Sequence, residues 1–139
     1  MDERERHARG LEVRRAVLGE EHVARRRAAT TAFDRDFQDL ITRYAWGEIW
    51  TRPGLSRRER SLLTLAMLLA RGHWEEFVLH LRGARRNGAS PDDIRELLLQ
   101  AAIYCGVPAA NHAFSLAREV LAAEIEGGDD SPCGLSGAS

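Results

Sequence analysis

Residues 56–70 read SRRERSLLTLAMLLA, and this stretch decides the fold class. Ser56 and Glu59 have the spacing of a capping box, in which the serine and glutamate side chains satisfy free amides at a helix start. The ten residues that follow are apolar on nearly every side of a helix, yet they are too few to span a bilayer. The stretch therefore predicts a central buried helix.

The rest of the chain shows helical periodicity almost throughout, and no useful length of it alternates as a strand does. Glycine and proline residues punctuate the pattern and mark helix ends. The expected helical stretches cover residues 3–18, 21–29, 34–50, 56–71, 73–87, 91–105 and 107–126. The fold class predicted is all-α, a compact bundle of about six helices in one domain over residues 1–126. Residues 127–139 form a polar, Gly/Ser-rich tail, predicted to be disordered.

The composition of the chain argues against several classes of function. The chain has 139 residues, 44% hydrophobic and 29% charged, as in an ordinary globular protein. Its net charge of -1 gives no electrostatic case for binding nucleic acid or an anionic membrane. The charged N-terminus does not resemble a signal peptide, and Cys105 and Cys133 form neither a CxxC pair nor a disulfide framework. A cytoplasmic location is expected.

The stretch RGHWEEFVLH, residues 71–80, holds the first group of candidate site residues. His73, Glu76 and His80 follow one another at i, i+3 and i+7, on the shoulder of an apolar helix face. A solvated shoulder is the plain structural interpretation. Metal binding would need further ligands, whereas proton transfer needs only a histidine and a carboxylate one helical turn apart. No metal site is predicted.

A second group lies in YCGVPAANHA, residues 104–113. Asn111 and His112 fall in the first turns of the expected last helix. Free amides and the positive end of the helix dipole favour a bound carboxylate there and lower the pKa of a nearby histidine. A buried His112 with backbone partners is the alternative, and the sequence leaves the two open.

A third group surrounds the turn before the central helix. Trp46 and Trp50 are spaced for packing against each other, although Trp46 is kept as a candidate substrate contact. Most of the arginines nearby are expected to be solvated. Arg60 is the best candidate to turn inward, because it immediately precedes the buried run, and Arg52 is the second choice.

Taken together, WTRPGLSRRERS and YCGVPAANHAF resemble the carboxymuconolactone decarboxylase family, in particular its protocatechuate (β-ketoadipate pathway) branch. The resemblance extends from about residue 9 to 124. It implies an alkylhydroperoxidase-D-like helical fold that assembles into homo-oligomers, trimers or hexamers. Peroxidases of the same superfamily carry Cys-x-x-Cys-x-x-x-His, whose cysteine positions fall here at His73 and Glu76 and whose histidine is His80. Without the thiol pair, peroxidase chemistry is not expected.

The resemblance implies an unsaturated lactone substrate that bears one carboxylate on the ring and another on an acetate arm. Its ring conjugation accepts the electrons left by carbon dioxide, so no cofactor is expected. We hypothesise that His80 delivers the proton, with Glu76 holding its ring, and that His112 donates a hydrogen bond to the substrate. Arg60, with Arg52 in reserve, is expected to bind the acetate carboxylate. Asn111, Trp46 and His73 complete the expected substrate contacts.

Two alternatives remain open at this point. The chain could be a non-catalytic helical oligomer or binding module of the same fold. It could also be a related lactone- or peroxide-handling enzyme, although the missing CxxC pair counts against a peroxidase.

Overall fold

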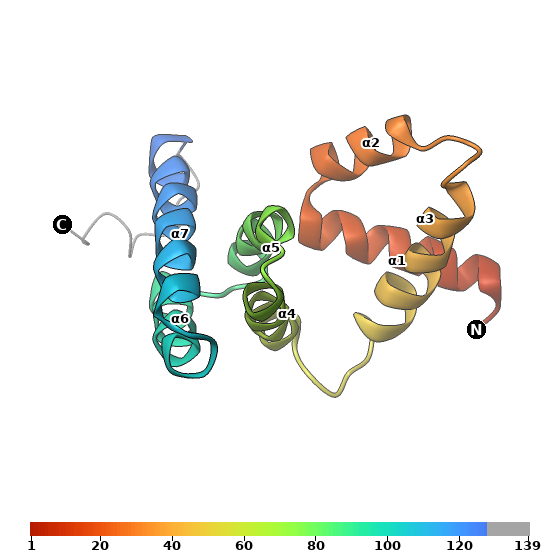
Figure 1. Ribbon diagram of the computed structural model, residues 1–139. Helices are drawn as coiled ribbons and strands as arrows, with labels where there is room; N and C mark the ends of the chain where they lie inside the picture. Colours follow the sequence, from red (N-terminus) through yellow and green to blue (C-terminus); the bar gives the residue numbers. More distant parts are fainter. Residues whose placement is uncertain (128–139) are drawn as a thin grey trace. The chain divides into compact units, whose positions relative to one another are not determined.

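The computed structural model describes residues 1–127, and every regular element among them is helical (Figure 1). The all-α prediction is thus confirmed, with seven α-helices and one π-helix in these residues instead of about six. In chain order they are α1 (Glu3–Leu18), α2 (Glu20–Ala29), α3 (Arg35–Ile41), η1 (Thr42–Ile49), α4 (Arg57–Arg71), α5 (Trp74–Arg86), α6 (Pro91–Cys105) and α7 (Val107–Gly127). The predicted tail, with Cys133, lies outside the described residues from 128 onward.

The capping signals of the sequence are found at helix starts. The Ser56 hydroxyl accepts a hydrogen bond from the Glu59 amide at 3.1 Å, and the Ser56 amide donates to Glu59 Oε1 at 2.8 Å. Ser90 and Asp93 form the same box before α6, at 3.0 and 2.9 Å. These bonds satisfy amides that the first helical turn leaves without partners, so both helices begin where the sequence predicts.

The backbone contacts divide the chain into two compact units, residues 1–60 and the residues from 61 onward. In the first unit, α1 packs along η1, and the two helices approach each other closely at two glycines. A Cβ on Gly10 would lie 1.9 Å from the Thr42 carbonyl oxygen, and one on Gly47 would lie 2.3 Å from the Arg6 carbonyl oxygen. Neither position can accept a side chain, so both glycines are required for this helix pair.

Residues of η1 and their neighbours fix the interior of the first unit. Arg14 is buried, and its guanidinium donates to Thr42 Oγ1 and Gln38 Oε1, both at 3.2 Å. Burial lowers the pKa of Arg14, and the nearby positive charge of Arg26 adds to this effect. The sequence predicted an ordinary helix here; the π-helical hydrogen bond from Trp50 N to Ala45 O, 3.0 Å, shows the wider winding.

The core of the second unit is formed by α4, α5, α6 and α7. Leu65, Leu69, Phe77, Leu81 and Leu98 are at most 1% exposed. Figure 1 shows α6 and α7 lying side by side, and α5 also contacts α7. This is a contiguous apolar cluster, to which each of the four helices contributes.

The prediction of a helix buried on nearly every side is wrong for α4 within the single chain. Leu65 and Leu69 are buried, but Leu63 is 46% exposed and Met67 61% exposed. The reason is geometric, because the neighbouring helices cover only the side of α4 that carries Leu65 and Leu69. Among the described residues, no helix has both the length and the apolar character needed to cross a membrane.

Candidate active site

The α5 helix presents Glu76 and His80 one turn apart. Phe77 and Leu81 on the same helix are at most 1% exposed, and they fix which side of α5 faces the core. Glu76 is exposed next to this face, whereas His80 is half-buried with its Nδ1 atom inaccessible to solvent. At i, i+4 spacing the two residues lie on one surface of α5.

His73 does not belong to this helical surface. It is the residue before α5, with φ of −86° and ψ of 77°, so its side chain does not continue the i, i+3, i+7 stripe that the sequence suggested. Its ring lies near Arg71, whose Nε donates to His73 Nε2 at 3.4 Å. Both residues are exposed. The helical part of the predicted stripe is therefore the pair Glu76 and His80.

Asn111 and His112 lie near the start of α7, as the sequence predicts, and both are exposed. The buried His112 considered as an alternative is thus not what the structure has. The His112 ring contacts the Trp74 ring edge to face, with centroids 4.6 Å apart. Trp74 is the first residue of α5, so His112 lies beside the first turn of the helix that carries Glu76 and His80.

Trp74 contacts a candidate site residue, and it is not among the residues that the sequence pointed to. It also packs on Phe77, with ring centroids 5.5 Å apart. Its contact with His112 joins positions 38 residues apart, across the α5–α7 packing. The spacing of residues along one helix cannot predict a contact between two separate helices.

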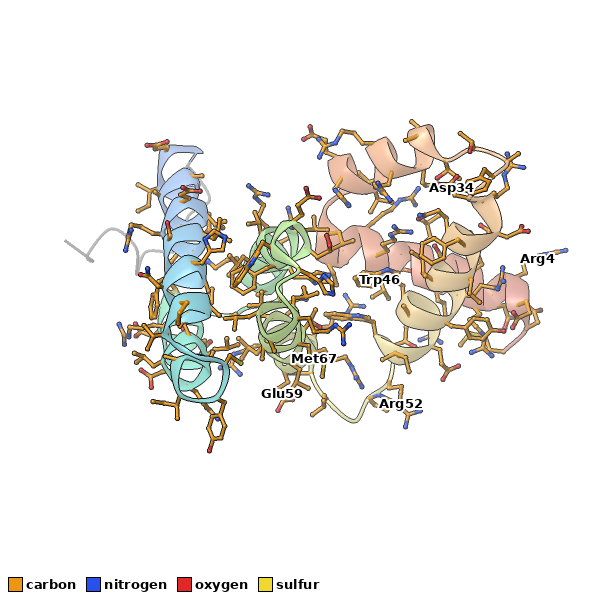
Figure 2. All side chains as sticks on the ribbon, viewed as in Figure 1. Arg4, Asp34, Trp46, Arg52, Glu59 and Met67 are labelled. Carbon is orange, nitrogen blue, oxygen red and sulfur yellow. The ribbon has the colours of Figure 1, made fainter. Side chains whose placement is uncertain are left out.

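The remaining predicted residues, Trp46, Arg52 and Arg60, belong to the first unit. Trp46, labelled in Figure 2, is 7% exposed. Its ring stacks on that of Trp50 with centroids 5.1 Å apart, so packing accounts for it. Arg60 is half-buried, and its Nη2 donates to the Arg52 carbonyl oxygen at 3.2 Å. The guanidinium of Arg60 thereby holds the backbone that carries the exposed Arg52 side chain.

Ser61 is fully buried on α4, and its Oγ accepts a hydrogen bond from Asn87 Nδ2 at 2.9 Å. This bond joins α4 to the residue after α5. A structural role is sufficient for Ser61 here.

Within residues 1–126, no three His, Cys, Asp or Glu side chains are grouped closely enough to hold a metal ion. The free Cys105 is exposed at the end of α6.

Comparison with known proteins identifies the family. The model of the carboxymuconolactone decarboxylase family matches residues 35–119, from α3 into α7. The chain is 48% identical over 121 residues to 4-carboxymuconolactone decarboxylase of Acinetobacter baylyi, covering 87% of this chain and 90% of the relative. It is 42% identical over 120 residues to nitrosuccinic acid decarboxylase of Metarhizium robertsii, covering 86% and 84%.

The family match contains α5 with Glu76 and His80, and the start of α7 with Asn111 and His112. The similarity covers most of the length of both relatives, so it is not confined to one motif. The chain belongs to the carboxymuconolactone decarboxylase family.

Proposed function

We propose that the chain is a carboxy-lyase that removes carbon dioxide from 4-carboxymuconolactone and releases 3-oxoadipate enol-lactone. The observation that carries this proposal is the 48% identity to a 4-carboxymuconolactone decarboxylase over nearly the whole of both chains. Glu76 and His80, one turn apart on α5, and His112, in contact with the Trp74 ring, supply groups suited to the reaction.

In this reaction the protein needs to do little more than position the substrate and deliver a proton to it. When the bond to the departing carboxylate breaks, its electron pair enters the conjugated ring and reaches the lactone carbonyl oxygen. A hydrogen-bond donor facing that oxygen stabilises the dienolate, and an acid then protonates the ring carbon next to the carbonyl. The substrate itself is the electron acceptor, so we propose that no cofactor takes part.

In this proposal His80 is the acid that protonates the ring, and Glu76, one turn earlier on α5, orients the imidazole. His112, with Asn111 beside it, donates a hydrogen bond to the lactone oxygen or to a substrate carboxylate. The Trp74 ring restricts the His112 ring to one side, as their edge-to-face contact indicates. His73 and Trp46 are assigned only supporting contacts with the substrate.

Arginine suits the acetate arm, because its planar fork can bind both oxygens of a carboxylate. Arg60 and Arg52 are the two candidates, and they are linked through the hydrogen bond from Arg60 to the Arg52 carbonyl.

The relative from Metarhizium robertsii supports a second candidate substrate, nitrosuccinic acid. A nitro group on the carbon that loses carbon dioxide would accept the electron pair as a nitronate, just as the conjugated lactone accepts it as a dienolate. Both substrates would carry a second carboxylate that the reaction keeps. The same proton donor and the same arginine could therefore serve either acid.

We further propose that the enzyme works in the cytoplasm as a homo-oligomer, a trimer or hexamer. Large apolar side chains exposed on the single chain support assembly: Leu63 and Met67 on α4, and Leu99 and Ile103 on α6. An unpartnered apolar surface of this kind is typical of protein–protein interfaces.

The test is a direct assay of the purified protein with each acid, after treatment with a chelator. We expect the lactone absorbance to change as carbon dioxide is released in equal amount, with the chelated protein fully active. Turnover of nitrosuccinic acid alone would select the second candidate. A folded oligomer that turns over neither acid would instead favour a binding module, and activity that returns only with added metal would refute the cofactor-free mechanism.

A further inference from the structure

The first unit contains a hollow of about 230 Å³ whose wall is rich in arginine. The volume equals that of roughly eight water molecules, which is enough for a small organic acid. One wall comes from α1, and the other from the segment between η1 and α4 together with the first residue of α4. The lining residues are Arg9, Glu12, Val13, Trp50, Thr51, Arg52, Leu55 and Arg57.

The charges in this hollow are unbalanced. Arg9, Arg52 and Arg57 contribute three guanidinium groups, against the single carboxylate of Glu12. All three arginines are exposed, and none of them forms an ion pair with a carboxylate of residues 1–126. A small concave surface with a net positive charge and free arginine forks favours an anion with planar, bidentate groups.

The segment that carries Arg52 is held in place from several directions. The Trp50 ring stacks on the buried Trp46 ring, and the Thr51 hydroxyl donates to the Gly47 carbonyl at 2.9 Å. The Arg52 amide donates to the Ile49 carbonyl at 3.2 Å, and the Arg52 carbonyl accepts from Arg60 Nη2 at 3.2 Å. The backbone under the Arg52 side chain is therefore ordered before any ligand arrives, which reduces the entropic cost of binding.

A smaller part of the lining is apolar. Val13, which is buried, Trp50 and Leu55 contribute this part beside the arginines. A lone inorganic anion would use the guanidinium groups and leave the apolar part without contacts. An acid with carboxylates at the ends of a short carbon chain uses both.

We propose that this hollow is a binding site for a small dicarboxylate, in which Arg9, Arg52 and Arg57 hold the carboxylate groups and Trp50 lies against the carbon chain. Arg60 does not line the hollow, and its part is that of a positioning residue acting through the Arg52 backbone. The site proposed here lies wholly within the first unit, and binding of a dicarboxylate to it does not rest on the proposed function.

The first measurement is calorimetric titration of the full-length protein with succinate at low ionic strength. We expect a dissociation constant on the order of 1 mM for a ligand of this size. Arg52→Gln/Arg57→Gln should weaken succinate binding by at least about tenfold, because two charge-assisted contacts are lost. Glu12→Gln should tighten it several-fold, because a like charge is removed. Arg4→Gln/Arg27→Gln, which removes two exposed arginines outside the hollow, is the matched control and should bind as wild type does.

Three results would overturn the proposal: no succinate binding at tens of millimolar, equal binding by the Arg52/Arg57 double variant, or sulfate binding as tightly as succinate. Failure of the proposed function would look different, because wild type would turn over neither acid while still binding succinate. Arg60→Lys should weaken succinate binding by a smaller factor than the double variant does, since it alters only the support of Arg52.

Discussion

The rings of Trp74 and His112 meet edge to face, with centroids 4.6 Å apart and planes inclined at 87°. An aromatic pair of this geometry stabilises a structure by about 0.5–1.5 kcal/mol beyond simple burial. The contact also joins the start of α5 to the first turns of α7.

Replacing Trp74 should therefore affect catalysis through His112. We expect Trp74→Leu to lower kcat/KM by about 2- to 10-fold, which corresponds to the free energy of the ring contact. Trp74→Phe keeps an aromatic face and serves as the matched control, with a loss of less than about twofold. Steady-state kinetics at a temperature where both variants are folded would test this, and equal losses in the two variants would contradict it.

If His80 is the proton donor, replacing it should lower kcat. His80→Gln should lower kcat by about 10²- to 10⁴-fold, the usual contribution of general acid catalysis, with little change in KM. Glu76→Gln should have a smaller effect of about tenfold, because Glu76 acts through the His80 ring. A His80→Gln enzyme with normal turnover and normal product would remove His80 from the mechanism and leave His112 as the acid.

Local signals predicted much of the fold. The capping pair Ser56 and Glu59 has the predicted bonds, and Gly106 has a φ of 99° where it separates α6 from α7. The π-helix was not predicted. Its backbone lies against α1 at Gly10 and Gly47, a close contact between residues distant in sequence that no propensity along η1 encodes.

The candidate site, like the fold, has one part that the sequence predicted and another that it did not. Glu76 and His80 lie on one helix, so their spacing predicted that they share a surface. The Trp74–His112 contact and the hollow lined by Arg9, Arg52 and Arg57 depend on packing between separate elements. Arginines spread over α1 and the segment before α4 look like ordinary solvated charges until the chain folds.

The two sides of α4 should respond differently to truncation. Leu65 is fully buried in the second unit, so Leu65→Ala should lower the free energy of unfolding by about 2–5 kcal/mol. Leu63 is 46% exposed on the same helix, and Leu63→Ala in the monomer should cost less than about 1 kcal/mol. Urea unfolding at low protein concentration would measure both, and equal losses would show that the core has been misassigned.

The capping box at α4 predicts a dependence of stability on pH. The hydrogen bond from the Ser56 amide lowers the pKa of Glu59 below its ordinary value of 4.5. The carboxylate therefore stabilises the fold above about pH 4.5, and this contribution is lost as the pH falls through the lowered pKa. Glu59→Gln should be less stable than wild type at pH 7, and the difference should shrink below pH 4.5.

Thermal unfolding of the two proteins from pH 7 to pH 3 would follow this difference. Ser56→Ala removes the other half of the box and should cost about 1 kcal/mol at pH 7. A difference between wild type and Glu59→Gln that stays constant across this range would contradict the assignment, because the glutamine cannot titrate.

The last prediction concerns assembly and follows from the exposed side of α4. Met67 is 61% exposed and Leu63 46% exposed on this side, and Figure 2 labels Met67 on the helix. If a second copy of the chain covers this surface, Met67→Glu places a charge in an apolar contact and should reduce association by at least about tenfold. Sedimentation velocity over a range of concentrations would measure the change. Met67→Leu keeps the apolar contact and should assemble as wild type does, which separates the loss of an interface from a general loss of stability. Wild type that sediments as a fully active monomer would refute the homo-oligomer, and an unchanged oligomer of Met67→Glu would place the interface elsewhere.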